Sequence, residues 1–458
     1  MRLQWNIIAM KIFVIFLAPT TSCTDSSERI KERTDDDDHF TVLVIDDGFD
    51  SSPEVFDGKI VAQYNLICKG SSEENDLALP FEELKKKALK GLSETDSTTC
   101  KLNRGNNSTL NPNLSKSSSL KESWNEAVLN KEIDIYRRDL TKSQNDLLDD
   151  ILSGSNGKYA THGTQTSSVI AYNNPKVKIV TLQIELSTAN EFERKKDCNT
   201  QDEIDNYVRL VRDPDYREAY INRPDSVIDK KLKQIVKEHN IKIANLSFSS
   251  PARVKLERKF EENGCGKVDL RSYFLEDNKL SQEKVAAEEK SVEVLAISSA
   301  GNDGIEVDSF QDTNQCSDQD NLTLIVGSYN YSSSRKDPAI SDFSQYGKCV
   351  DAYAFGHRVI TATPGGFLNV VSGTSFSAPM AIRYITQNFD PSLTPRKIME
   401  EFLDSRDRRR FLPMESYPEE LAFESSTSVD SFALSAPSNV QKVLKNRKVF
   451  RHLRQIFR

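Results

Sequence analysis

Two adjacent carboxylates follow a short apolar run near the start of the chain. Residues 42–50 read VLVIDDGFD, in which Asp46 and Asp47 come directly after four apolar residues. A run of this length is consistent with a buried strand, and Asp-Asp-Gly is typical of a turn beyond its end. On this stretch alone, the acid pair could bind a metal ion, orient a general base or form a polar turn.

A serine stands where a helix is expected to begin. Residues 372–381 read SGTSFSAPMA, in which Ser375 follows Gly-Thr and precedes a run compatible with a helix. Backbone N–H groups and the dipole at a helix N-terminus favour developing negative charge. This position suits a nucleophile, because the acyl intermediate forms an oxyanion beside it. The other interpretation is a structural serine in a turn of small residues.

A serine nucleophile needs a base, and the chain offers five histidines: His39, His162, His239, His357 and His452. His162 lies in YATHGTQTSSVIA (159–171), whose small residues suit a helix packed closely against a sheet. His39 lies beside four aspartates and is expected to be solvated, and His239 ends a polar helix. His162 is therefore the candidate base, against the alternative of a surface or capping histidine.

An asparagine could supply a hydrogen-bond donor to the same chemistry. Residues 297–304 read ISSAGNDG, a strand followed by a turn that would hold the Asn302 amide at the carboxyl edge of a sheet. An amide N–H aimed at the substrate carbonyl is what an oxyanion hole requires. Read alone, Gly-Asn is simply a turn.

The elements that would position these residues alternate between strands and helices. Apolar runs typical of buried strands recur at 41–45, 177–184, 241–248, 292–298 and 322–328. Helical patterns lie between and after them, at 226–239, 280–289 and 396–403. Continuous apolar strands that alternate with helices predict an α/β fold, with a mostly parallel sheet covered by helices on both faces.

Taken together, these stretches resemble the motifs of subtilisin-type serine proteases, the subtilase family (peptidase S8). VLVIDDGFD resembles the aspartate motif, THGTQTSSVIA the histidine motif and SGTSFSAPMA the serine motif. IANLSFSS resembles the substrate-binding strand, and ISSAGND the motif of the oxyanion asparagine. Their order, Asp then His then Ser, is that of subtilisin itself. The resemblance covers residues 41–382 and implies a subtilisin-like, doubly wound fold.

The resemblance also implies a role for each residue. The catalytic triad would be Asp46, His162 and Ser375, and Asn302 with the Ser375 backbone N–H would form the oxyanion hole. Substrate would bind at Asn245, Ser247, Phe248, Ser249 and Gly301, with 245–249 pairing to it as an edge strand. The function implied is that of an exported serine endopeptidase acting through an acyl-enzyme intermediate. Its partners would be polypeptide substrates, and its chemistry requires no cofactor.

The sequence departs from the family pattern at several positions. Asp47 replaces a usual Ser or Thr, Ser249 a common glycine, and Phe355 a frequent proline. Only residues 24–40 separate the N-terminal segment from the first strand, so the large propeptide usual in the family is not expected. The alternative function is a catalytically weak or inactive homologue that binds peptide or a partner protein. VLVIDD also resembles the acid pair of a phospho-receiver domain. That class of protein fits the serine motif and an export signal poorly.

The N-terminal segment 1–23 predicts export. Arg2 and Lys11 precede or flank the apolar stretch 12–18, which is too short to span a bilayer, and small polar residues follow. A small residue before Cys23 resembles a bacterial lipoprotein cleavage site, so lipidation of Cys23 is one alternative. Without Cys23, six of the seven cysteines remain, an even set that allows 15 pairings. The sequence has no CxxC pair, so a zinc site is not expected.

The predicted organisation is an export signal (1–23), a polar linker (24–40), a peptidase domain (41–444) and a basic tail (445–458). Charged insertions at 69–157 and 187–225 interrupt the domain, partly disordered or laid over the surface. The first of them is either a lid over the substrate or a passive loop. A net charge of −8 argues against nucleic-acid binding. Membrane contact would come only through Cys23 or the basic stretch 442–458, and no loop shows calcium-ligand spacing.

Overall fold

The computed structural model describes residues 38–46, 48–69, 80–93, 99–104, 118–153, 161–186, 200–222, 227–249, 252–287, 293–313, 316, 322–330, 338–406 and 410–412. The predicted export signal, most of the linker and the basic tail lie outside these residues, as does Asp47. Within the described ranges, no helix is long and apolar enough to cross a bilayer.

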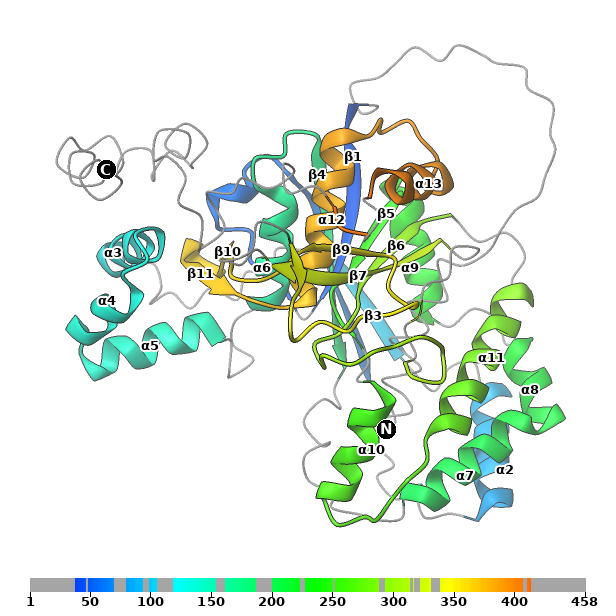
Figure 1. Ribbon diagram of the computed structural model, residues 1–458. Coiled ribbons are helices and arrows are strands. Elements are labelled where there is room, and N and C mark those ends of the chain that lie inside the picture. Colours follow the sequence, from blue (N-terminus) through cyan, green and yellow to red (C-terminus); the bar gives the residue numbers. More distant parts are fainter. Residues whose placement is uncertain are drawn as a thin grey trace, which may run out of the picture.

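A mostly parallel sheet forms the centre of the molecule (Figure 1). Its strands are β1 (Phe40–Asp46), β2 (Ile60–Lys69), β3 (Thr99–Arg104), β4 (Val177–Leu186), β5 (Ile243–Leu246), β6 (Leu295–Ser299), β7 (Thr323–Asn330), β8 (Ala339–Ile340) and β9 (Ala352–Phe355). Their order is β3-β2-β4-β1-β5-β6-β7-β8, and β9 also pairs with β7. Among the described strands of this sheet, only the β2–β3 and β7–β8 pairs are antiparallel. The chain order reverses at β1, where a doubly wound sheet places its ligand crevice.

Helices cover both faces of the sheet, so the predicted fold class is confirmed. Two helices that contact each other, α6 (Thr161–Ala171) and α12 (Thr374–Asn388), lie side by side across β1, β4–β7 and β9. α9 (Val227–Glu238) and α13 (Pro395–Ser405) add apolar side chains to the same central core. The central strands β1, β4, β5, β6, β7 and β9 are buried on both faces, which explains why they read as continuous apolar runs.

Helices of the two charged insertions, together with those of residues 253–287, form two further helical groups, each with its own buried cluster. The first contains α2 (Phe81–Ser93), α7 (Thr200–Arg212), α8 (Pro214–Ile221), α10 (Arg253–Glu262) and α11 (Arg271–Ala287). The second contains α3 (Ser118–Leu129), α4 (Ile133–Asp139) and α5 (Lys142–Ser153), packed on the hairpin of β10 (Val359–Ala362) and β11 (Leu368–Val371). Figure 1 shows the two groups on different sides of the sheet.

The second group is anchored to the hairpin by polar contacts as well as by its apolar cluster. The Trp124 indole N–H donates to Leu368 O at 2.7 Å. The Asn125 amide donates to Gly366 O at 3.0 Å and accepts from Leu368 N at 2.8 Å. β11 leads directly into the turn before Ser375, so the group packs on the strand that delivers the candidate nucleophile. Whether residues 69–157 gate substrate stays a prediction.

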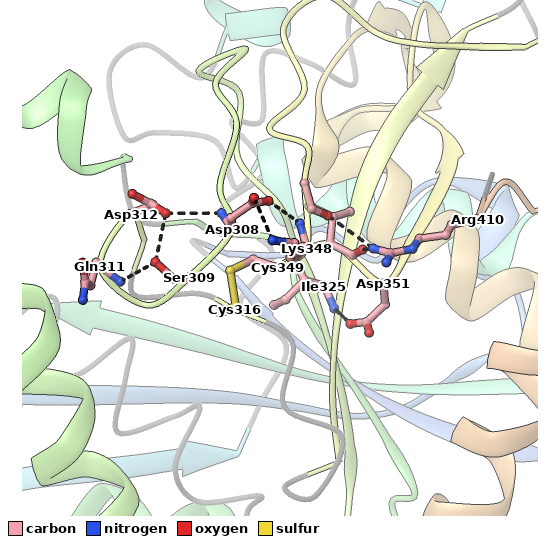
Figure 2. The surroundings of a disulfide bond; sticks show 12 residues. Asp308, Ser309, Gln311, Asp312, Cys316, Ile325, Lys348, Cys349, Asp351 and Arg410 are labelled. Atoms are coloured by element: carbon pink, nitrogen blue, oxygen red, sulfur yellow. Dashed lines mark hydrogen bonds and ion pairs between the residues drawn. A yellow bond between two sulfur atoms is a disulfide. The ribbon is translucent and has the colours of Figure 1, made fainter. Parts of the chain in front are cut away.

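One of the pairings open to the cysteines is a disulfide between Cys316 and Cys349 (Figure 2). Backbone and side-chain hydrogen bonds brace the segments around it. Asp308 Oδ1 accepts from Lys348 N at 2.8 Å, Asp351 Oδ2 accepts from Ile325 N at 2.8 Å, and Arg410 Nη1 donates to Val350 O at 2.5 Å. The bond therefore joins the segment after β6 to the loop before β9 at the core.

A buried acid in the first helical group makes stability depend on pH. Tyr207 Oη donates to Asp277 Oδ1 at 2.6 Å, and each residue is 2% exposed. Burial raises the pKa of Asp277 to about 6, although the Tyr207 hydrogen bond opposes the rise. A raised carboxyl pKa contributes stability that is present below the unfolded value, 3.8, and is lost as pH rises through about 6.

We expect Asp277→Asn to be more stable than wild type at pH 8, by up to about 3 kcal/mol, because the neutral amide avoids the cost of a buried carboxylate. The advantage should disappear below about pH 4, where the wild-type carboxyl is protonated in both states. Urea unfolding at pH 4, 6 and 8 measures it, with the exposed Asp202→Asn as the control. Equal stability of wild type and the Asp277→Asn variant at every pH would contradict the prediction.

Candidate active site

The acid and the candidate base meet where β1 ends and α6 begins. Asp46 is the last residue of β1, and His162 is the second residue of α6. His162 Nδ1 lies 2.8 Å from Asp46 Oδ1, and Thr166 Oγ1 donates to Asp46 Oδ2 at 3.1 Å. The acid side chain is 8% exposed and the imidazole 36%. The carboxylate is thus shielded and held at both oxygens, while the ring can reach a substrate.

The glycine after His162 permits this close approach. A Cβ added at Gly163 would lie 2.0 Å from Gly48 O and 2.9 Å from Asp46 Cβ, which no packing can tolerate. Any side chain there would push the first turn of α6 away from the end of β1. A glycine is therefore required after His162 for steric reasons, apart from any chemical role of the histidine.

The third acid of VLVIDDGFD has a structural part. Asp50 is 2% exposed, and its carboxylate accepts from Ser52 N (2.9 Å), Ser52 Oγ (2.7 Å) and Gly365 N (2.8 Å). Its own N–H donates to Thr164 Oγ1 at 2.9 Å. Asp50 therefore ties the loop after β1 to α6 and to the turn 364–366. Within the described ranges, no group of three or more His, Cys, Asp or Glu side chains could hold a metal ion.

Ser375 is the second residue of α12, at its N-terminal turn, and Asn302 follows β6 at the same edge of the sheet. Asn302 Oδ1 accepts from Thr374 N at 2.8 Å and from Thr374 Oγ1 at 3.0 Å. Thr374 Oγ1 also accepts from Gly301 N at 3.1 Å. With Oδ1 engaged as an acceptor, Nδ2 is the end of this exposed amide that can donate to a substrate.

The base lies close to the turn that carries Ser375. The ring centroids of His162 and Phe376, the residue after Ser375, are 5.8 Å apart. Ser375 is half-buried, whereas residues 376–383, which follow it in α12, are buried. An imidazole hydrogen-bonded to a shielded carboxylate therefore lies near the N-terminal turn of the helix that carries Ser375.

A proline in α12 explains one contact of Ser375. Pro379 has no N–H, so it cannot bond to the carbonyl of Ser375, its i−4 partner in the helix. Ser247 Oγ donates to Ser375 O at 2.8 Å instead. Asn245 Nδ2 in turn donates to Ser247 Oγ at 2.9 Å. The polar side chains at the end of β5 thus hold the first turn of α12.

This arrangement corrects part of the substrate-binding prediction. Residues 245 and 246 pair with β1 on one side and with β6 on the other, and the Asn245 side chain is fully buried. They lie in a central strand, so the expectation that 245–249 forms an edge strand for substrate is wrong for these two residues. Only Ser247, Phe248 and Ser249 extend past the strand, and the last two are half-buried.

The remaining predicted contact, Gly301, has both backbone polar groups occupied within the protein. Its N–H bonds to Thr374, and its carbonyl accepts from Gln345 N at 2.9 Å. Next to Asn302, Asp303 accepts from Ala252 N at 2.9 Å and Gln345 Nε2 at 3.2 Å, and it forms an ion pair with Lys255. These contacts fix the turn on both sides of Asn302.

Sequence reasoning missed three residues that shape the site: Thr166, Thr374 and Ser247 as a support for Ser375. Thr166 is four positions after His162, so the helical period puts both side chains on one face. That spacing is readable in the sequence once α6 is accepted as a helix. The contacts of Thr374 and Ser247 join segments 72 and 128 residues apart, and no local pattern announces them.

Three relatives share short stretches with this chain. "Subtilisin-like protease 5" of Arthroderma otae is 37% identical over 83 residues, and the counterpart of Arthroderma gypseum is 35% identical over 83 residues. In both cases the match covers 18% of this chain and 18% of the relative. The Trichophyton tonsurans protein of the same name is 49% identical over 41 residues, 9% of this chain and 10% of the relative. The chain thus matches less than a fifth of each relative's length.

Among solved structures, a cold-adapted subtilisin-like serine proteinase aligns over 87% of this chain and 93% of its own, with 15% identity and a TM-score of 0.33. A match of that strength supports no argument about this site. The model of the subtilase family (Peptidase_S8) matches residues 37–416, more than four-fifths of the sequence and every segment of the site described above. The chain therefore belongs to the subtilase family.

Proposed function

We propose that this protein is an exported serine endopeptidase that cleaves peptide bonds through Asp46, His162 and Ser375. The observation that carries the proposal is the 2.8 Å contact between Asp46 Oδ1 and His162 Nδ1. The His162 ring lies near Phe376, in the helix turn that carries Ser375. Membership of the subtilase family supports a serine peptidase. The names of the relatives, subtilisin-like proteases, agree with that class.

In the first half-reaction, Ser375 Oγ attacks the carbonyl carbon of the scissile peptide bond. His162 Nε2 takes the hydroxyl proton, and the imidazolium that forms is stabilised by the Asp46 carboxylate at Nδ1. The Asn302 side-chain amide and the Ser375 backbone N–H donate to the oxyanion. His162 then gives its proton to the leaving amine as the C–N bond breaks, which leaves the acyl group on Ser375.

In the second half-reaction, water replaces the leaving amine. His162 takes a proton from the water as it attacks the acyl carbon, and the same donors bind the second oxyanion. Collapse breaks the bond to Ser375 Oγ, which recovers its proton from His162 and releases the carboxylic acid product. Asp46 keeps its negative charge throughout, because its part is to fix the tautomer and the orientation of His162.

Export is part of the proposal and rests on the N-terminal segment 1–23. The Cys316–Cys349 disulfide agrees with it, because such bonds persist in oxidising compartments outside the cytosol. Lipidation at Cys23 would make the protein envelope-associated, whereas removal of Cys23 with the signal would make it secreted. Mass analysis of the mature N-terminus from the native host distinguishes these two cases.

The function is tested by labelling purified protein with a fluorophosphonate probe, which reacts with an activated serine without a known substrate. Wild type is expected to label at one site, and Ser375→Ala to lose the label completely. Ser372→Ala, a change of an exposed serine three residues away, is the matched control and should label like wild type. Labelling that survives in Ser375→Ala would place the reactive serine elsewhere. A folded wild type that does not label would favour an inactive homologue that binds peptide or a partner protein.

A further inference from the structure

Two cations converge on the carboxyl end of α6, far from the candidate triad. Arg383 lies in α12 and is 1% exposed. Its Nη1 donates to Tyr172 O and lies 3.5 Å from Val169 O, and its guanidinium stands 5.4 Å from the Tyr172 ring. Lys59, which directly precedes β2, donates from Nζ to Ala171 O. A buried arginine is rare in proteins, so its placement at this helix end calls for a physical account.

The carboxyl end of a helix is where such cations are stabilised. The last four carbonyl groups of α6 have no partner within the helix, and the helix dipole is negative there. Backbone N–H groups just beyond the helix bond to two of them: Tyr172 N to Ser168 O at 2.9 Å and Asn174 N to Ala171 O at 3.2 Å. Side chains donate to the carbonyls of the helix end and of the two residues after it. Their contacts are Arg383 at residues 169 and 172, Asn174 at Ile170 (3.1 Å), Lys59 at Ala171 and Gln387 at Asn173 (3.2 Å). Two of these donors, Arg383 and Gln387, come from α12.

A third residue of α12 completes the connection. Asn174 Nδ2 donates also to Thr386 Oγ1 at 2.7 Å, and both residues are fully buried. The carboxyl end of α6 is therefore bonded to one face of α12, at residues 383, 386 and 387, the last two of which lie three and four positions after the first. Apolar packing alone would let the two helices slide or pivot; directional hydrogen bonds do not.

The two cations also repel each other. Burial and the Arg383 guanidinium lower the pKa of Lys59 to about 8. Their proximity is electrostatically unfavourable by itself, and a methionine at either position would fill similar volume without that repulsion. Arg383 and Lys59 lie close together because both donate to carbonyl groups at the carboxyl end of α6.

We propose that Arg383, assisted by Lys59, is a positioning residue for His162. The inference rests on the proposed function. His162 is nine residues from Ala171 in α6, roughly 13 Å along the axis, and Ser375 is eight residues from Arg383 in α12, roughly 12 Å. The two helices therefore meet at one end in Arg383 and at the other in the candidate base and nucleophile. A pivot of about 5° at the Arg383 end would move His162 by roughly 1 Å, and a misplacement of that size can cost about 10²-fold in rate.

The experiment compares Arg383→Met, which removes the charge and the hydrogen bonds, with Arg383→Lys, which keeps the charge. Fluorophosphonate titration counts the active sites, so kcat is expressed per labelled serine and unfolded protein does not enter it. We expect Arg383→Met to lower kcat about 10–100-fold on a peptide substrate with KM changed by less than about 3-fold. Arg383→Lys should recover part of the loss, because a single ammonium can still reach the carbonyls.

The matched control is Arg406→Met. Arg406 also donates to backbone carbonyls, those of Leu403 and Asp351, but it lies after α13 and away from α6. The Arg406→Met variant should have a lower melting temperature and an unchanged kcat per labelled site. Lys59→Met is the second test variant, because Lys59 is half-buried and its replacement is less disruptive should Arg383→Met not fold. It should lower kcat about 10-fold.

Each result has one meaning. Wild-type kcat per labelled site in the folded Arg383→Met variant, or in Lys59→Met when the former does not fold, would overturn the inference and leave a purely structural role. An equal loss in Arg406→Met would also overturn it, because the effect would not depend on α6. Failure of wild type to label at all would instead overturn the proposed function, and this inference with it.

Discussion

Replacing His162 with alanine is expected to lower kcat by about 10⁶, the largest effect of any single change after loss of Ser375 itself. In subtilisin, the reference enzyme for this value, loss of the triad histidine lowers kcat by about 2 × 10⁶. The serine hydroxyl is a weak nucleophile at its free pKa, so without a base its proton has no acceptor. The leaving amine also loses its proton donor.

The measurement is peptide hydrolysis per folded protein, with fold checked by circular dichroism. His239→Ala is the control: His239 Nε2 contacts Tyr64 Oη at 2.8 Å and lies after α9, away from the candidate triad. It should leave kcat within about 3-fold of wild type, because it removes no contact to the site. Activity of His162→Ala within 100-fold of wild type would show that another group is the base.

Replacing Asp46 with asparagine is expected to lower kcat by about 10⁴, with little change in KM. The amide has nearly the same shape as the carboxylate, so the position of His162 is kept. Its N–H₂ group, however, would donate toward Nδ1 and favour the tautomer that places the proton on Nε2, where the base must be free. The imidazolium also loses the negative charge that stabilises it.

A second acid of the same stretch is the control. Asp50→Asn removes hydrogen-bond acceptors from Ser52 and Gly365 but leaves His162 untouched. It should lower the melting temperature, and kcat per fluorophosphonate-labelled site should change far less than in Asp46→Asn. Equal losses in the two variants would mean that the whole loop after β1, and not the Asp46 charge, supports the base. Only a loss confined to Asp46→Asn agrees with the assigned role.

The central sheet was predictable because parallel strands are buried on both faces. Their sequences must be apolar at successive positions, as in 42–45 and 324–326, and such runs are visible without any alignment. The helical groups were not visible in the same way. Trp124, Val128, Leu148 and Ile151 are fully buried, but they occur at helical spacing among polar and charged residues, without a long apolar run. Composition there predicted a segment partly disordered or laid over the surface, and it carried no information about packing against β10–β11.

The substrate-binding prediction shows a second limit. The stretch IANLSFSS (243–250) has no feature that distinguishes a central strand from an edge strand. Strand order settles it, since β5 lies between β1 and β6 and only residues beyond 246 are open to a new partner. Sheet order depends on long-range pairing, for which a local apolar pattern carries no information.

The sequence by itself determined the α/β class, the subtilase motifs and which aspartate, histidine, serine and asparagine to consider, because each sits in a short stretch with a local signature. Only the tertiary structure decided that Asp46 and His162 touch, that Asp50 does not join them, and that Ser247 supports Ser375. The tertiary structure also decided the role of Arg383. In the sequence it is a single charged residue within a helix, and only the fold places its guanidinium at the carboxyl end of α6. Local residue patterns select elements, whereas the distances between elements depend on how distant segments pack, and chemistry depends on those distances.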